Sequence, residues 1–253
     1  MGRALLPRYA EKEIRRSIGS QIKCEPYLWS DMKKYYEAYE DRYKAVHEMG
    51  ERWTADVNTP IVSEIIEEFG IGASDRMLEI GCGEGRDAGV LLARGFDLTA
   101  TDVSAEAVEY CKKLYPEYAG SFKVLDCVKD APDGEYDFIY AVAVLHMLVD
   151  DEDRSAFLRF VRDGLAENGI GLVLSMGDGK SEMQSDPSKA FTLQQRELNG
   201  KPVMLAGTSC RMVSFPHLIA ELDSNGLRVV KYGITEIPKE FPEIMYAVVK
   251  RKE

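Results

Sequence analysis

Over most of the chain, short apolar runs alternate with stretches whose apolar residues recur at helical spacing. The first run contains Met77, Leu78 and Ile80 and predicts a buried parallel strand. The same alternation predicts strands at 77–80, 97–102, 122–127, 136–144, 170–176, 227–237 and 244–250, and helices at 60–69, 86–94, 105–114, 154–166 and 215–224. Strands that alternate with helices predict an α/β fold built on a mostly parallel sheet.

Hydroxyl side chains directly precede three of the predicted helices. Thr59, Ser104 and Ser214 stand at positions where a side-chain oxygen commonly accepts a hydrogen bond from the first helical turn. We therefore predict all three residues as N-caps.

Residues 1–57 differ from this pattern, because they are helical in character and rich in aromatic residues. Tyr36, Tyr39 and Tyr43 recur at i, i+3 and i+7 and therefore share one face of a helix. One interpretation is that this face packs on the main domain. The other is that the segment is an arm that covers a ligand, with Trp53 and a tyrosine lining the pocket.

A long polar segment, residues 177–213, interrupts the alternation before the last helix. Asn199-Gly200 lies between two strand-like stretches, 191–198 and 202–205, and predicts a β-hairpin. A connection of this length in a compact domain is usually functional or disordered. Since it leaves the carboxyl end of the sheet, we predict that it is a lid over a substrate.

Composition narrows the class of protein. The 253 residues are 45% hydrophobic and 30% charged, which is ordinary for one elaborated globular domain. The longest apolar run, 138–149, is too short to span a bilayer, and no signal peptide is indicated. The five cysteines are odd in number and contain no C-x-x-C pair, which favours reduced thiols and a cytoplasmic location.

The net charge of −11 is unevenly distributed. Residues 1–60 hold 11 Lys and Arg against 10 Asp and Glu, so the remainder holds 21 against 33. A domain this acidic argues against nucleic acid as a partner, because binding a polyphosphate needs a basic surface. We expect a small-molecule substrate and no membrane partner.

Three glycines, Gly81, Gly83 and Gly85, alternate directly after the first predicted strand. They let the backbone turn sharply and approach a ligand closely. The dinucleotide fingerprint G-x-G-x-x-G would need a third glycine at position 86, which is Arg86. Asp102 ends the second predicted strand, so the glycine turn and this acid are expected at the same crevice of the sheet.

The string E-I-G-C-G-E-G, with an acid seventeen positions after its last glycine, resembles the first motif of the class I S-adenosylmethionine-dependent methyltransferases. The resemblance implies that the turn cradles the methionine part of the cofactor and that Asp102 holds the ribose hydroxyls. It also implies that Asp126 accepts from the adenine amino group while the backbone of Cys127 serves a ring nitrogen. An acid that merely caps a loop is the other interpretation of Asp126. The cofactor-binding residues that we expect are Trp53, Glu79, Gly81, Cys82, Gly83, Gly85, Asp102, Val103, Asp126, Cys127 and Ala141.

The stretch F-I-x-A-x-x-V-L-H that begins at residue 138 looks like the fourth motif of small-molecule methyltransferases, where backbone groups around Ala141 touch the cofactor. His146 directly follows the fourth predicted strand and is the best-placed candidate for a catalytic base, should the acceptor need to lose a proton. A histidine here is equally compatible with a structural role. His217 lies in a distal helix and is predicted to be structural. No metal-ligand spacing is evident.

The resemblance implies a Rossmann-like, seven-stranded methyltransferase sheet whose last strand is antiparallel, with helices on both faces. We expect an N-terminal helical arm at 1–57 and the S-adenosylmethionine-binding domain at 58–253. The layout is most similar to the tellurite-resistance and thiopurine-type methyltransferases, which act on small acceptors. The expected function is methyl transfer by in-line displacement. A non-catalytic cofactor-binding regulatory module and an NAD-dependent oxidoreductase are the alternatives, the latter disfavoured by Arg86.

Overall fold

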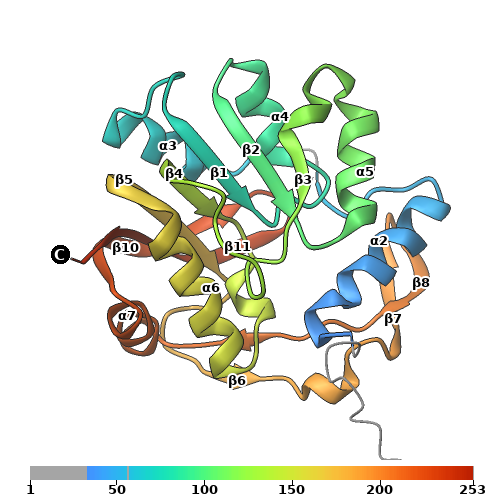
Figure 1. Ribbon diagram of the computed structural model, residues 1–253. Helices are drawn as coiled ribbons and strands as arrows, with labels where there is room; N and C mark the ends of the chain where they lie inside the picture. Colours follow the sequence, from blue (N-terminus) through green and yellow to red (C-terminus); the bar gives the residue numbers. More distant parts are fainter. Residues whose placement is uncertain (1–32, 56, 253) are drawn as a thin grey trace, which may run out of the picture. The chain divides into compact units, whose positions relative to one another are not determined.

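A seven-stranded sheet forms the centre of the fold, with helices on both of its faces (Figure 1). The computed structural model describes residues 33–55 and 57–252, and the described residues from Lys34 onward form one compact unit. The strands are β1 (Arg76–Ile80), β2 (Asp97–Asp102), β3 (Phe122–Val124), β4 (Tyr136–Ala141), β5 (Leu165–Ser175), β10 (Leu227–Ile237) and β11 (Phe241–Arg251). Their order across the sheet is β10-β11-β5-β4-β1-β2-β3.

Strands β3, β2, β1, β4 and β5 pair in parallel, whereas β11 is antiparallel to both of its neighbours, β5 and β10. The seven strands and the antiparallel last strand confirm the fold that the resemblance implied. The order reverses next to β1, and ligands of open α/β sheets bind at such a point, beyond the carboxyl ends of the strands.

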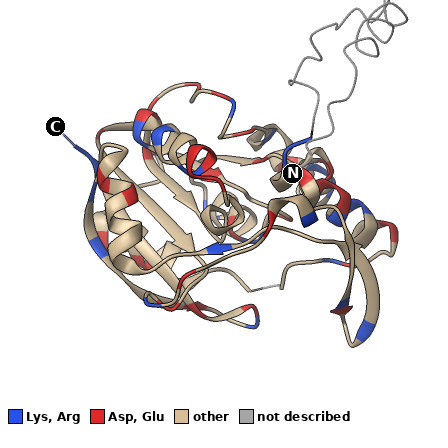
Figure 2. Cartoon of the chain, turned by 90° about the horizontal axis from the view of Figure 1, so that it is seen from below, with Lys and Arg blue, Asp and Glu red and all other residues tan. Residues whose placement is uncertain are grey.

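The two faces of the sheet bury separate apolar cores because successive strand residues point to opposite sides. On β1, Met77 packs in the core beneath α3 (Pro60–Phe69), α4 (Arg86–Ala93) and α5 (Ala105–Leu114). Leu78 and Ile80 pack in the core beneath α6 (Asp151–Gly164) and α7 (Phe215–Ser224). Strands buried on both faces read as continuous apolar runs, which is the pattern in the sequence. In Figure 2 charged residues lie mainly on the surrounding helices and loops.

One of the three predicted N-caps forms as predicted. The Ser104 hydroxyl accepts a hydrogen bond from the backbone N–H of Ala107 at 3.1 Å and caps α5. Thr59 and Ser214 stand at the predicted N-cap positions of α3 and α7, but their side chains do not make the expected cap bond. Their hydroxyls instead donate to carboxylates, Thr59 to Asp87 (2.8 Å) and Ser214 to Glu182 (2.6 Å). A hydrogen bond to an ionised acceptor is about twice as strong as a neutral one, which explains the preference.

Two strands end earlier than their apolar patterns predicted. β3 was predicted to run to residue 127 but ends at Val124, because its pairing with β2 stops where β2 stops, at Asp102. β4 was predicted to run to residue 144 but ends at Ala141, and two residues later Ala143 takes a positive φ of 58°. This left-handed conformation is incompatible with a continuing strand. A third strand, β5, begins at residue 165 rather than 170.

Within the predicted arm, residues 1–32 and 56 lie outside the described part of the chain. The described part contains a 3₁₀ turn, η2 (Tyr35–Glu37), followed by α2 (Ala38–Glu48). Further 3₁₀ turns are η3 (Pro116–Ser121), η4 (Leu145–Met147) and η5 (Pro187–Lys189). Among the described residues, no helix combines the length and apolar character needed to cross a membrane.

Residues 177–213 form two small antiparallel pairs. The predicted hairpin is confirmed: β7 (Leu193–Leu198) pairs with β8 (Lys201–Ala206). Asn199 and Gly200 both have positive φ, 51° and 75°, as a two-residue hairpin turn of type I′ requires. β6 (Met183–Gln184) pairs with β9 (Arg211–Met212). The hairpin packs against α2, far from it in sequence (Figure 1), with Val46 of α2 in one apolar cluster with Leu198 and Leu205.

Candidate functional site

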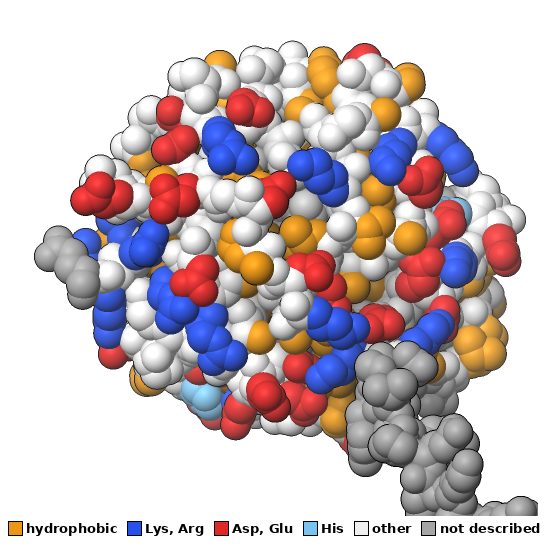
Figure 3. Space-filling view, in the orientation of Figure 1, with side chains coloured by type: hydrophobic (Ala, Val, Ile, Leu, Met, Phe, Trp, Pro, Cys, Tyr) orange, Lys and Arg blue, Asp and Glu red, His pale blue; other side chains and the backbone are white. Residues whose placement is uncertain are grey.

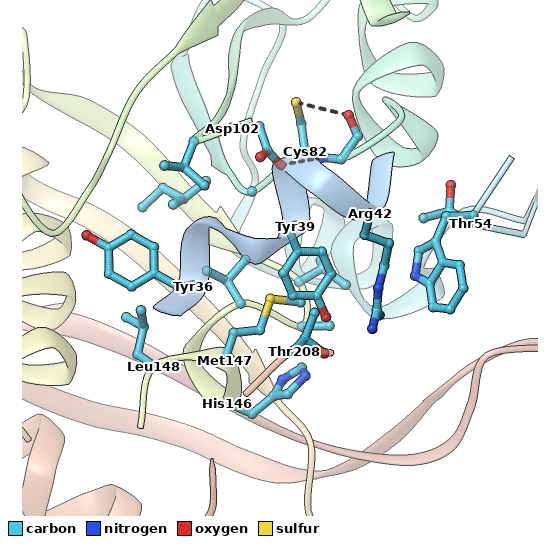
Figure 4. Close-up of a pocket in the computed structure, with 18 of the residues that line it drawn as sticks. Tyr36, Tyr39, Arg42, Thr54, Cys82, Asp102, His146, Met147, Leu148 and Thr208 are labelled. Carbon is cyan, nitrogen blue, oxygen red and sulfur yellow. Dashed lines mark hydrogen bonds between the residues drawn. The ribbon is translucent and has the colours of Figure 1, made fainter. Parts of the chain in front are cut away.

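A cavity of about 410 Å³ opens beyond the carboxyl ends of β1, β2 and β4, at the reversal of strand order. This volume lies in the usual range of small-molecule sites. Predicted site residues that line it are Trp53, Glu79, Gly81, Cys82, Gly83, Asp102, Val103, Asp126, Cys127 and His146. Gly85 and Ala141 do not line the cavity. The wall opposite the sheet comes from η2, α2 and the segment 177–213 (Figure 4).

The glycine turn is tied to β2 by its backbone. The N–H groups of Gly81 and Cys82 both donate to the carbonyl of Thr101, at 2.7 and 2.8 Å. Gly81 and Gly83 have φ of 75° and 53°, which favour glycine. A Cβ on Gly81 would overlap the side chain of Val144. Val144 fills the space beside Gly81, so no side chain larger than that of glycine fits at this position of the turn.

Gly85 shapes this turn from outside the cavity. It is the N-cap of α4, with φ of 75°, and its N–H donates to the carbonyl of Cys82 at 2.9 Å. Ala141 is likewise indirect, since it is the buried last residue of β4 and the cavity is lined instead by Val142, Ala143 and Val144.

Asp102 is buried at the cavity wall. One carboxylate oxygen accepts from the N–H of Gly83 (2.9 Å) and the other from the N–H of Ser104 (2.8 Å). Burial raises the pKa of Asp102 to about 6, while these backbone donors act in the opposite direction. Each oxygen keeps a further lone pair, so the residue can accept two hydroxyl groups, as a ribose would offer.

Glu79 is an acid of a different kind. It is 2% exposed, and burial beside Asp87 raises its pKa to about 8. Near neutral pH its carboxyl group is therefore mostly protonated and can donate a hydrogen bond.

Asp126 is engaged by the arm. The Tyr36 hydroxyl donates to its carboxylate at 3.0 Å, and Lys129 forms an ion pair with it at 3.1 Å. It also accepts from the N–H of Val128, so part of its function is to cap the loop after β3. Burial and the charge of Asp126 raise the pKa of Tyr36, which stays protonated. Tyr36 belongs to the tyrosine stripe, and the structure places it and Tyr39 at the cavity.

Trp53 reaches the cavity because a buried acid holds its backbone. Glu84, which is fully buried, accepts from the N–H of Trp53 (2.8 Å), the N–H of Thr54 (2.8 Å) and the Thr54 hydroxyl (2.7 Å). It also contacts Nε2 of His47 at 3.0 Å. Sequence reasoning missed the importance of Glu84, although it stands inside the glycine motif.

His146 lies in the loop after β4 and is 4% exposed. Its Nδ1 accepts from the N–H of Met176 at 3.4 Å, which places the proton of the neutral ring on Nε2. Burial, with the charge of Arg154, lowers the pKa of His146 to about 4, so the ring is neutral near pH 7. A base role requires that the bond from the Met176 N–H to Nδ1 be given up, because Nδ1 is the unprotonated nitrogen of this tautomer.

The chain is similar to one protein family model and to several solved structures. Residues 77–169 match the model described as a methyltransferase domain. No curated protein matches the sequence. Among similar solved structures, the CcbJ methyltransferase from Streptomyces caelestis has a TM-score of 0.64 and 13% identity, with coverage of 87% of this chain and 100% of the other.

Two further structures share the fold. The Burkholderia thailandensis 1,6-didemethyltoxoflavin-N1-methyltransferase, with 1,6-didemethyltoxoflavin and S-adenosylhomocysteine bound, has a TM-score of 0.64 and 15% identity over 87% of this chain and 89% of that one. A TehB-like S-adenosylmethionine-dependent methyltransferase from Corynebacterium glutamicum has a TM-score of 0.53 and 17% identity over 86% and 98%. These findings show that residues 77–169 match a methyltransferase domain and that the chain has the fold of S-adenosylmethionine-dependent methyltransferases.

Proposed function

We propose that the protein transfers the methyl group of S-adenosylmethionine to a small-molecule acceptor held in the same cavity. The observation that carries this proposal is the two-sided construction of the cavity. One side is the glycine turn with Asp102, and the other is built from α2 and residues 177–213. No finding supports a purely regulatory cofactor-binding module or an NAD-dependent oxidoreductase.

In this proposal the chain orients the cofactor along the carboxyl edge of the sheet. The turn around Gly81 and Gly83 receives the methionine part, Asp102 accepts from the ribose hydroxyls, and Asp126 with Cys127 faces the adenine. The cofactor supplies an activated methyl group on a sulfonium, whose departure as a neutral thioether needs no acid. The protein's main task is then to align the acceptor with the methyl group, and alignment alone can lower the barrier by several kcal/mol.

The arm and the insertion complete the proposal. We assign residues 34–54 and 177–213 to closing the cavity over both ligands, which excludes water and fixes the approach of the acceptor. Two contacts support this assignment: Tyr36 bonds Asp126, and Ser209 donates to the carbonyl of Met147 at 2.7 Å.

A small acceptor is also favoured over nucleic acid by charge. The net charge is −11, and on the face seen in Figure 3 basic side chains are mixed with acidic ones. A cytoplasmic location belongs to the proposal as well. It is supported by the cysteines, of which the four in the described part of the chain are all free.

Calorimetric titration with S-adenosylmethionine and S-adenosylhomocysteine tests the proposal. We expect micromolar dissociation constants, weakened at least about tenfold in Asp102→Asn because a carboxylate acceptor is lost. Asp97→Asn removes a charge from the exposed start of the same strand and should bind as the wild type does. Absence of binding to the wild type, or equal binding by Asp102→Asn, would overturn the assignment. Release of S-adenosylhomocysteine in an acceptor screen then separates an enzyme from a regulatory module.

A further inference from the structure

Charge is segregated within the cavity. Its acidic lining residues come from β1, α4, β2, the loop after β3 and the turn between β10 and β11: Glu79, Asp87, Asp102, Asp126 and Glu240. The lining residues from α2, the loop around η4 and residues 177–213 include two arginines, Arg42 and Arg196, and no acid. The side that we assign to the acceptor is therefore electropositive, in a protein whose net charge is −11.

Arg42 is a buried cation with no acidic partner in the described part of the chain. It is 3% exposed, and its guanidinium lies over the rings of Tyr39 (5.1 Å) and Trp53 (4.6 Å). Its Nε and Nη2 both donate to a single acceptor, the carbonyl of Ala206, at 3.3 and 2.8 Å. Among the described residues no carboxylate forms an ion pair with Arg42, whereas the third arginine of the cavity, Arg86, pairs with Glu240 and Asp87.

A buried arginine of this kind is costly unless something compensates its charge. Burial lowers the pKa of Arg42, and the positive charge of Arg196 lowers it further, against the opposing effect of Tyr39. Two like charges brought toward one cavity are stabilised when an anion lies between them. The five N–H donors of a guanidinium suit a planar or tetrahedral oxyanion.

The fold keeps the two arginines together. Arg196 is on β7. Ala206, whose carbonyl accepts both hydrogen bonds from Arg42, is on the paired strand β8. Helix α2 and the hairpin are therefore connected at the cavity. The side chain of Arg196 itself is oriented by a bond from Nη2 to the Gln194 side chain at 2.8 Å.

Apolar side chains form part of the wall on this side, beside the hydroxyl groups of Thr208 and Ser209. Tyr39, Met147 and Leu148 lie around the same space in Figure 4, and Phe241 also lines it. An acceptor that fills it combines an aromatic or aliphatic body with one polar end.

We propose that the methyl acceptor is an organic anion, whose carboxylate or phosphate group binds between Arg42 and Arg196 while its apolar body packs against Tyr39 and Met147. This inference rests on the proposed function and names the class of acceptor. The carboxylate of the cofactor is the other anion that could reach Arg42, and the experiment separates the two.

The test uses the full chain saturated with S-adenosylhomocysteine and titrated with three anions, benzoate, phenyl phosphate and indole-3-acetate. Benzamide, phenol and indole-3-acetamide serve, in the same order, as their uncharged counterparts. We expect at least one anion to bind about tenfold or more tightly than its uncharged counterpart, with an affinity that falls as salt rises. Arg196→Gln should weaken anion binding about fivefold or more and leave the affinity for S-adenosylhomocysteine unchanged. Lys201→Gln is the matched control, because Lys201 lies on the same hairpin, is exposed and does not line the cavity.

Each outcome of this experiment either supports or overturns the proposal. If none of the three anions is preferred over the uncharged probes, or if Lys201→Gln has the same effect as Arg196→Gln, the proposal is wrong. If Arg196→Gln weakens S-adenosylhomocysteine binding as much as anion binding, the arginines serve the cofactor and the proposal is also overturned. In these cases the wild type still binds the cofactor, whereas failure of the proposed function removes cofactor binding itself. Arg42→Lys, which keeps the charge but loses the planar fork, should weaken phenyl phosphate binding and leave the affinity for S-adenosylhomocysteine unchanged, with folding checked by circular dichroism. A loss of S-adenosylhomocysteine affinity as large as the loss for phenyl phosphate would assign Arg42 to the cofactor and overturn the proposal.

Discussion

The carboxylate of Glu84 accepts two hydrogen bonds from Thr54, one from its backbone N–H at 2.8 Å and one from its hydroxyl at 2.7 Å. Glu84 stands between two glycines of the turn, and Thr54 stands 30 residues earlier, in the segment after α2. Glu84 therefore ties the glycine turn to the segment that follows α2. Stability and cofactor binding should be coupled through this one side chain.

Replacing Glu84 by Gln tests that coupling. The amide keeps the size of the carboxylate but loses the charge. Its NH₂ group cannot accept a hydrogen bond, so it faces N–H or O–H donors of Trp53 or Thr54 that are left without an acceptor. We expect the free energy of unfolding to fall by about 2–4 kcal/mol, and cofactor affinity to fall with it. Urea unfolding and calorimetry measure the two effects. Glu109→Gln, on the exposed face of α5, is the control and should change neither; an effect of Glu84→Gln no larger than this would contradict the anchoring role.

The conformation of Gly83 leads to a second prediction. Gly83 has φ of 53°, and a Cβ there would lie 2.8 Å from the Tyr43 hydroxyl. Gly95 also has a positive φ, 85°, but has open space around it. Alanine should cost roughly 1 kcal/mol of backbone strain at either position, whereas only Gly83→Ala should also weaken S-adenosylhomocysteine binding, by about tenfold or more.

A double variant identifies the cause. Adding Tyr43→Phe removes the oxygen that the new methyl group meets, so Gly83→Ala with Tyr43→Phe should recover part of the lost affinity. Calorimetry on the single and double variants gives the comparison. Equal losses in Gly83→Ala and Gly95→Ala would show that strain, rather than the close approach of Tyr43, limits the site.

The raised pKa of Asp102 predicts how cofactor binding depends on pH. In the free protein its pKa is about 6, because burial disfavours the charged form. Ribose hydroxyls donate to the ionised carboxylate, so binding favours ionisation and releases a proton at low pH. We expect the affinity for S-adenosylhomocysteine to be level above pH 7 and to fall by up to about tenfold per pH unit below pH 6.

Calorimetry between pH 5 and pH 8, in buffers of different ionisation enthalpy, measures both the affinity and the proton release. Asp102→Asn should bind weakly and lose this pH dependence. Glu79→Gln is a useful companion, because Glu79 has a pKa of about 8 and the amide mimics its protonated form. An affinity that stays level down to pH 5 in the wild type would show that Asp102 does not bind the cofactor as an anion.

Much of the fold could be predicted because local patterns and long-range packing agree there. The bounds of β2, α3, α5, α7 and β10 follow from apolar spacing and from end signals such as Pro60 and Gly226. Errors occurred where the apolar pattern continued after pairing had stopped. Val142 and Val144 extend the run of β4, yet the positive φ of Ala143 turns the chain toward the cavity.

The residues of the site also fall into those that could be predicted from sequence and those that could not. That Gly81, Gly83 and Asp102 line one cavity could be predicted, because they belong to a turn and a strand end that lie close in sequence. Glu84 and Arg42 could not be assigned their places, since their partners, Thr54 and Ala206, meet them only after the arm and the hairpin have packed. Identifying such residues from sequence requires knowing which distant segments touch.

His146 gives the last prediction, which concerns stability as well as chemistry. Its pKa is about 4 in the folded protein against an ordinary 6.5, so the unfolded chain binds the proton first as the pH falls. The stabilising contribution of the neutral ring is therefore complete above pH 6.5 and is lost between pH 6.5 and pH 4. A difference of this size corresponds to about 3 kcal/mol. His146→Gln, which cannot take up a proton, should unfold with a flatter pH dependence over this range, as measured by urea denaturation at several pH values.

In turnover, the Nε2–H tautomer leads us to expect that His146→Gln lowers kcat without moving the pH profile above pH 6, since the ring is already neutral there. If the loss of activity in His146→Gln becomes smaller as the pH rises, His146 acts as a base. Hydroxide, or an acceptor that is already ionised, would then replace the missing base at high pH.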